Sequence, residues 1–219
     1  MKKEQSVVEF YVACNRLKNM LRSGWALWGV DKERVESVAE HVYGVQQLAI
    51  VMWSQYGYDV DIKKVLSMLA IHELEEVAIG DLTQFEIDSK SKELKGHMAI
   101  RQLLKNLSQC DNLESLILEF DERRTPEAQF AYQCDKLECD LQSKIYDEEH
   151  CVDLSQQGSN PVANNPTVKT LLDSGMSWSE MWLTFGQQKY NYDKNFMAVS
   201  NFAKNNPITA IGKDETPTK

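Results

Sequence analysis

Apolar residues recur at the three- and four-residue spacing of an α-helix along nearly the whole 219-residue chain. No segment shows the strict alternation of a half-buried strand, so the pattern predicts an all-α protein. The segment at 151–166 is rich in Ser, Asn, Gln, Gly and Pro and is expected to be a loop. The predicted helices span about 5–22, 37–56, 61–79, 90–107, 112–121, 126–147, 163–173, 178–188 and 193–205.

Several predicted helix ends carry capping residues. The sequences SVAE, from Ser37, and SWSE, from Ser177, are capping boxes, in which the Ser and Glu side chains satisfy backbone N–H groups at the helix start. Thr125 followed by Pro126 indicates an N-cap with proline at the first helical position. Gly80 is expected to end the helix over 61–79.

Length and charge limit the class of protein. The length suits one domain, and we expect a single helical domain over 1–205 with a flexible tail over 206–219. The formal charge of −9 and the pI near 5.0 argue against a nucleic-acid polymer as partner, because binding a phosphate backbone requires clustered Lys and Arg. A small phosphorylated ligand held by a few local cations remains compatible with this charge.

Cysteine and hydropathy patterns indicate the cell compartment. The chain has five cysteines and no C-x-x-C pair, which is typical of reduced thiols in a cytoplasmic protein. No stretch approaches the roughly 18 consecutive apolar residues of a membrane span, so no membrane partner is expected.

The stretch MLAIHELEEVAIGDL, residues 68–82, places His72, Glu73, Glu75 and Glu76 among apolar residues. At the C-terminal end of the helix predicted over 61–79, acids are disfavoured by the helix dipole, and burying an unpaired carboxylate would cost several kcal/mol. A positive group is therefore expected beside them, and His72 with Glu73 and Glu76 offers donors that suit a divalent metal ion. The alternative is solvated glutamates and a hydrogen-bonded core histidine.

Two further residues could join such a site. His41 falls within the apolar stripe of the helix that begins at Ser37, in the first turn, where the helix dipole favours the neutral, metal-binding imidazole. Asp135 lies at the edge of the buried stripe of the helix over 126–147. It could bind a metal or pair with a surface cation such as Lys136. Each residue alone is weak evidence, since a lone buried histidine is more often a core residue.

Taken together and in this order, the motifs resemble the HD-domain metal-dependent phosphohydrolases, in particular the branch of 5′-deoxynucleotidases. The resemblance covers roughly residues 8–148 and depends on RLKNMLRSGW, ESVAEHVYGVQQLA, AIHELEEVAIGDLT and QCDKLECDL. It implies an HD-domain helical bundle, one divalent metal ion (Mn, Co, Fe, Ni, Zn or Mg), a nucleoside monophosphate as substrate and a homodimer.

The resemblance also assigns roles to residues. It implies that the catalytic glutamate is Glu76 and that the aspartate of the GDL element is Asp81. Arg22 matches a phosphate contact and Trp25 a sugar contact. Because the segment before His41 is about two residues longer than in the relatives, Trp28 is an alternative to Trp25. The implied metal ligands are His41, His72, Glu73 and Asp135.

One position departs from the family, whose name comes from a His-Asp pair, because this chain has His72-Glu73. The extra methylene moves the carboxylate by about 1.5 Å. We expect a bound metal, because Glu76, Asp81 and Asp135 all persist, and hence a phosphohydrolase acting on (deoxy)nucleoside 5′-monophosphates. The alternatives are an impaired HD protein that binds a nucleotide or partner without turnover, and an enzyme acting on another phosphorylated small molecule.

Residues outside these motifs have ordinary interpretations. His97 and His150 are expected to face solvent. The run DSKSKELK, from Asp88 to Lys95, could bring a lysine near the phosphate, although such charge runs usually form a solvated face. Trp178 and Trp182, four residues apart, are expected to be core or dimer contacts.

Overall fold

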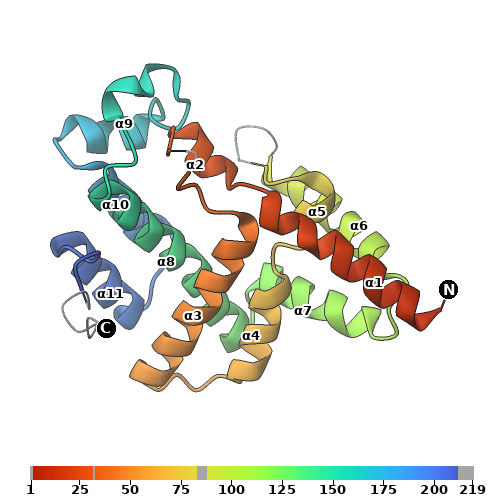
Figure 1. Ribbon diagram of the computed structural model, residues 1–219. Coiled ribbons are helices and arrows are strands. Elements are labelled where there is room, and N and C mark those ends of the chain that lie inside the picture. Colours follow the sequence, from red (N-terminus) through yellow and green to blue (C-terminus); the bar gives the residue numbers. More distant parts are fainter. Residues whose placement is uncertain (1, 32, 83–87, 212–219) are drawn as a thin grey trace, which may run out of the picture. The chain divides into compact units, whose positions relative to one another are not determined.

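The computed structural model describes residues 2–31, 33–82 and 88–211. Within these ranges the regular structure is helical, apart from an isolated bridge between Leu21 and Ser37, which confirms the all-α prediction. None of the described helices combines the length and apolar character needed to cross a bilayer. The helices, labelled in Figure 1, are α1 (Lys3–Cys14), η1 (Asn15–Asn19), α2 (Ser23–Leu27), α3 (Val38–Tyr56), α4 (Ile62–Ile71), α5 (Glu76–Ile79), α6 (Ser89–Leu104), α7 (Cys110–Glu122), α8 (Pro126–Glu148), η2 (Leu154–Ser159), α9 (Pro166–Asp173), α10 (Trp178–Lys189) and α11 (Lys194–Asn205).

The predicted caps are present. Ser37 begins α3: its hydroxyl accepts the Glu40 backbone N–H at 3.2 Å, and its own N–H donates to the Glu40 carboxylate at 2.6 Å. Ser177 and Glu180 form the same box at the start of α10. The Thr125 hydroxyl accepts the N–H of Ala128 at 3.2 Å at the start of α8.

One continuous helix was predicted wrongly. The segment over 61–79 is two helices, because α4 ends at Ile71 and the chain then makes turns in which Leu74 and Glu76 donate N–H bonds three residues back. Gly80, at φ +80°, ends α5 as expected. The acids therefore do not crowd the end of a long helix, and Glu76 lies in the first turn of α5.

Other boundaries also differ from the predictions. The helix predicted over 5–22 ends at Cys14 and continues only as the 3₁₀ helix η1. The short helices α2 and η2 were not predicted, and η2 lies within the expected loop over 151–166. The remaining predicted helices agree with the structure to within about three residues at each end.

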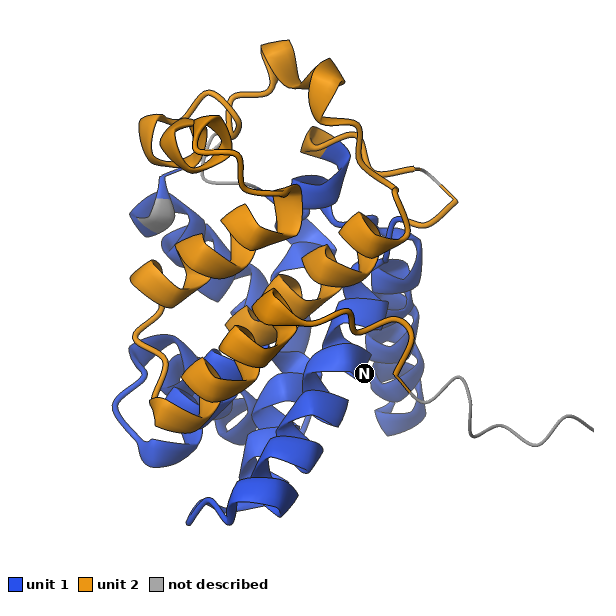
Figure 2. Ribbon diagram, turned by 90° about the vertical axis from the view of Figure 1, so that its left-hand side faces the viewer, with its two compact units in different colours: residues 1–26, 35–135 blue, residues 27–34, 136–219 orange. Residues whose placement is uncertain are grey.

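The chain divides into two compact units, coloured separately in Figure 2: residues 1–26 with 35–135, and residues 27–34 with 136–219. In the first unit α3 packs against α4, α4 against α7, and α6 against both α5 and α7. This packing buries one face of each helix. The fully buried apolar side chains of α3 and α4 include Val38, Val45, Ala49, Val65, Met68 and Leu69.

In the second unit α10 packs against both α9 and α11. Trp178 contacts Trp28 and Trp182 edge to face, at centroid distances of 5.7 and 6.1 Å. Trp28 and Trp178 are buried in this unit's core, and Trp182 is half-buried. The expected tail begins as an anchored segment, because the backbone N–H groups of Ile208 and Thr209 donate to the Glu148 carboxylate. Its remainder, 212–219, lies outside the described residues.

Gly186 on α10 packs closely against α8. A Cβ atom there would overlap the buried carboxylate of Asp140 on α8, which also accepts the Tyr192 hydroxyl at 2.8 Å. We expect Gly186→Ala to lower the free energy of unfolding by about 2–3 kcal/mol, since overpacking displaces a bonded group. Urea denaturation measures this. Gly158→Ala, where a Cβ would meet no atom within 4 Å, is the control, and equal stability of the two variants would contradict the packing argument.

Candidate metal centre

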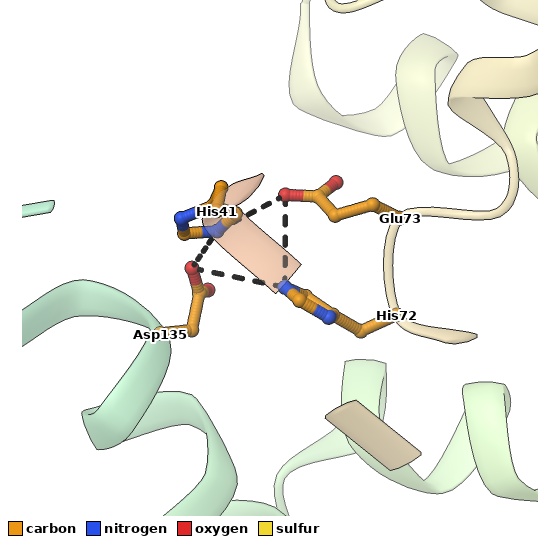
Figure 3. Close-up of side chains that lie close together, drawn as sticks. All are labelled: His41, His72, Glu73 and Asp135. Atoms are coloured by element: carbon orange, nitrogen blue, oxygen red, sulfur yellow. Dashed lines mark ion pairs between the residues drawn. The ribbon is translucent and has the colours of Figure 1, made fainter. Parts of the chain in front are cut away.

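Four side chains predicted as metal ligands converge in the first unit, as Figure 3 shows. They come from three places: His41 from α3, His72 and Glu73 from the turn after α4, and Asp135 from α8. His41, His72 and Asp135 are buried, and Glu73 is half-buried. One ligand atom from each residue lies within 4.8 Å of all the others.

The distances among these atoms suit a single ion. His41 Nε2 lies 3.6 Å from Glu73 Oε1 and 3.3 Å from Asp135 Oδ1. His72 Nε2 lies 3.7 and 4.0 Å from the same two oxygens. Because bonds from nitrogen or oxygen to such an ion are about 2.0–2.2 Å long, two ligands of one ion lie at most about 4.4 Å apart. All four distances fall within that limit.

The imidazole of His72 provides an independent test of whether the residues fit a cation. Its Nδ1 lies 2.8 Å from the carbonyl oxygen of Leu69, which can only accept, so Nδ1 carries the proton. Burial lowers the pKa of His72 and favours the neutral ring, which leaves a lone pair on Nε2. That buried Nε2 has no hydrogen-bond partner among the described residues and faces two carboxylate oxygens. A cation between these three acceptors would satisfy all of them, so the donor set fits a divalent metal ion.

A short segment of chain, residues 22–23, joins this cluster to Asp81. Arg22 Nη1 donates to Glu73 Oε1 at 3.0 Å. The backbone N–H of the next residue, Ser23, donates to Asp81 Oδ2 at 2.7 Å. Arg22 and Ser23, at the start of α2, therefore contact a predicted metal ligand and the predicted GDL aspartate, respectively.

Glu76 is buried beside a lysine. Glu76 is only 1% exposed, and its Oε1 lies 3.6 Å from Lys92 Nζ. Lys92 Nζ also donates to the carbonyl oxygen of Leu82 at 3.1 Å. Burial, with the charges of Glu73 and Asp81, raises the pKa of Glu76 to about 10. This raised pKa favours the protonated form of Glu76, which can donate a proton. Lys92 belongs to the run over 88–95, which brings a lysine to this carboxyl.

The two tryptophans considered for sugar contact occupy different units. Trp25 lies in the first unit, is 2% exposed, and donates its indole N–H to Glu36 Oε1 at 2.8 Å. Trp28 belongs to the second unit, where it packs on Trp178. The side chain of Trp25 is therefore fixed in orientation, and its contact with a sugar remains a prediction.

The two histidines outside the motifs differ from each other. His150 is exposed, as expected. His97 is half-buried, since 23% of its side chain is exposed, and its Nε2 lies 2.8 Å from Asp121 Oδ2. Contrary to expectation, it therefore does not face solvent freely but pairs with a carboxylate of α7.

The structure adds three residues to the surroundings of the site that the sequence did not single out for a role there. Glu36 orients Trp25, and Ser23 contacts Asp81. Burial and the charge of Glu73 raise the pKa of Glu75 to about 8, so this third glutamate is also largely protonated at neutral pH. The RSGW motif contains Ser23, but nothing in the sequence distinguishes its hydroxyl from that of a surface serine.

Comparison with known proteins agrees with this geometry. A protein family described as HD domain matches residues 14–171. The chain is 30% identical to the 5′-deoxynucleotidase hdd1 of Schizosaccharomyces pombe, over 85% of this chain and 98% of that protein. It is also 30% identical to the 5′-deoxynucleotidase HDDC2 of Dictyostelium discoideum, over 65% of this chain and 78% of that protein.

Solved structures show the same fold. The PH0347 protein of Pyrococcus horikoshii matches with a TM-score of 0.65 at 22% identity, over 90% of this chain and 98% of that one. A predicted metal-dependent phosphohydrolase of Magnetospirillum magnetotacticum matches with a TM-score of 0.56 at 21% identity, over 92% and 94%. The chain belongs to the HD-domain family of phosphohydrolases.

Proposed function

We propose that this protein is a divalent-metal-dependent phosphomonoesterase that removes phosphate from (deoxy)nucleoside 5′-monophosphates. The observation that carries the proposal is geometric: His41, His72, Glu73 and Asp135 form a cluster able to hold a metal ion, and Glu76, a buried carboxyl, lies three residues after Glu73. The nucleotide substrate is supported by the names of the two relatives at 30% identity.

In this proposal His41, His72, Glu73 and Asp135 hold the metal. A bound divalent ion lowers the pKa of water and polarises a phosphate oxygen. Arg22, whose guanidinium lies 3.0 Å from Glu73, supplies paired N–H donors to the phosphate. Trp25 restricts the sugar from its fixed position.

Two acids divide the proton chemistry between them. Glu76 donates its proton to the oxygen of the leaving sugar, and burial, which raises the pKa of this carboxyl, favours the protonated form that this step needs. Asp81 orients the attacking water through a carboxylate that the Ser23 backbone N–H holds at 2.7 Å. Lys92, 3.6 Å from Glu76, stabilises the carboxylate that remains after the proton has left.

The wider setting is part of the same proposal. We place the protein in the cytoplasm as a homodimer, with one divalent ion in each chain and no nucleic-acid polymer or membrane as partner. Trp178 is buried within its own unit, so an interface on the C-terminal helices would have to use other side chains, such as the half-buried Trp182.

Phosphate release from a panel of nucleoside monophosphates, with Mn²⁺ or Co²⁺ added, tests the function. We expect hydrolysis of 5′-monophosphates that stops on chelation and returns with metal. Tight nucleotide binding without phosphate release would contradict the proposal and support a binding protein. Activity confined to other phosphorylated compounds would contradict the nucleotide assignment alone.

A further inference from the structure

The side chain of Ser23 contains a buried hydroxyl that nothing else in the site accounts for. Its Oγ is inaccessible to solvent and has no hydrogen-bond partner among the described residues. Leaving a buried hydroxyl without a partner is unfavourable, and most such groups in folded proteins are bonded. The buried, unpaired hydroxyl therefore indicates a hydrogen-bond partner that the described residues do not supply.

The backbone fixes where this hydroxyl lies. The N–H of Ser23 donates to Asp81 Oδ2 at 2.7 Å, and the N–H of Arg22 donates to the carbonyl oxygen of Glu36 at 3.0 Å. The N–H of Val38, at the start of α3, donates to the carbonyl oxygen of Met20 at 2.8 Å. These bonds fix the backbone of the segment against the start of the helix that carries His41, so Ser23 lies beside Asp81 and directly after Arg22.

The neighbouring groups identify the kind of partner. Arg22 directly precedes Ser23 and lies 3.0 Å from Glu73, a proposed ligand of the metal. An arginine side chain and a hydroxyl donor on consecutive residues, with the arginine bonded to a cluster able to hold a cation, are complementary to an anion with several oxygens. Asp81 accepts the backbone N–H of Ser23, whereas the Ser23 hydroxyl makes no hydrogen bond to it.

We infer that Ser23 binds the substrate's phosphate: its Oγ–H donates to a phosphate oxygen, beside the guanidinium of Arg22. This inference rests on the proposed function, which supplies the phosphate, and adds a specific hydroxyl contact to it. The same bond forms with inorganic phosphate, the product that phosphomonoester hydrolysis leaves in the site.

Titration calorimetry measures the binding of inorganic phosphate to the Mn²⁺-loaded protein, and so tests this inference separately from turnover. We expect Ser23→Ala to weaken phosphate binding roughly 10-fold, as for loss of a hydrogen bond to a charged group, with metal content unchanged. Ser23→Thr keeps the hydroxyl and should bind within about threefold of the natural protein. Ser67→Ala is the control, because this hydroxyl on the exposed side of α4 bonds only to the Lys63 carbonyl oxygen.

The outcomes separate the two proposals. If phosphate binds and Ser23→Ala weakens it, but no nucleoside monophosphate is hydrolysed, the phosphate contact stands and the nucleotidase assignment fails. If nucleotides are hydrolysed while Ser23→Ala binds phosphate as tightly as the natural protein, the Ser23 contact is refuted. Failure of the natural protein to bind phosphate, or loss of metal from Ser23→Ala, also overturns it.

Discussion

Replacing Glu76 by glutamine is expected to slow phosphate release from the best nucleoside monophosphate by at least about 100-fold, the usual size of a general-acid contribution. Glutamine keeps the shape of the protonated carboxyl but has no proton to transfer to the leaving sugar oxygen. The metal should stay bound, because Glu76 is not among the four residues whose ligand atoms cluster. Steady-state kinetics and metal analysis of the same preparation check both expectations.

Glu75→Gln is the matched control for this change. Glu75 lies one residue before Glu76, and burial raises its pKa to about 8, so glutamine again replaces a largely neutral acid. It lies outside the proposed chemistry, and its variant should keep most of the activity. Equal losses in the two variants would show that the turn tolerates neither substitution and would remove the evidence for a general acid.

The pH dependence gives a second, independent check on Glu76. A general acid acts only while it is protonated, so activity should fall as the pH rises through the pKa of Glu76, which burial raises above its ordinary value. The glutamine variant should lack this alkaline limb in its residual activity. A limb of the same shape in both proteins would assign the titration to another group.

The residues of the metal centre could be found from the sequence because helical periodicity places them reliably. His41 interrupts an apolar stripe that a capping box fixes in register, and Asp135 lies at the edge of another stripe. Neither position depends on how the helices pack. The convergence of these residues does depend on helix packing, and the sequence indicated this convergence only through the order of the motifs.

The break after Ile71 could not be predicted, because residues 71–76 contain neither proline nor glycine. At the break the His72 ring bonds locally to the Leu69 carbonyl oxygen, and its other nitrogen faces Glu73 and, from a helix far along the chain, Asp135. Periodicity detects apolar faces and carries no information about such contacts. The prediction therefore extended one helix through the turn that presents Glu73.

That turn also bears on the departure from the family's His-Asp pair. Glu73 Oε1 lies 3.6 Å from His41 Nε2 and 3.7 Å from His72 Nε2, so the longer side chain brings an oxygen to the cluster. The same oxygen accepts Arg22 Nη1 at 3.0 Å. In this chain the extra methylene is thus compatible with a compact donor set, which supports a bound metal over an impaired site.

The variant Asp135→Asn should lose the metal while keeping the fold. The amide has almost the same shape as the carboxylate but removes the negative charge whose oxygen lies 3.3 Å from His41 Nε2. We expect metal affinity to fall at least about 100-fold, because even residues that only support a ligand contribute 10- to 100-fold. Phosphate release at a fixed low concentration of metal should fall in proportion.

Thermal and chemical unfolding with added Mn²⁺ distinguishes this loss from misfolding. At a metal concentration of about 100 times its dissociation constant, the natural protein should gain about 2.7 kcal/mol of stability. A 100-fold weaker variant would gain only about 0.4 kcal/mol under the same conditions.

Without metal the Asp135→Asn variant should be no less stable than the natural protein, because one of the two carboxylates that share the buried cluster has become neutral. Asp59→Asn, the same change at an exposed position, should gain the full stabilisation. If Asp135→Asn gains it as well, Asp135 does not hold the ion, and the centre must be built from other residues.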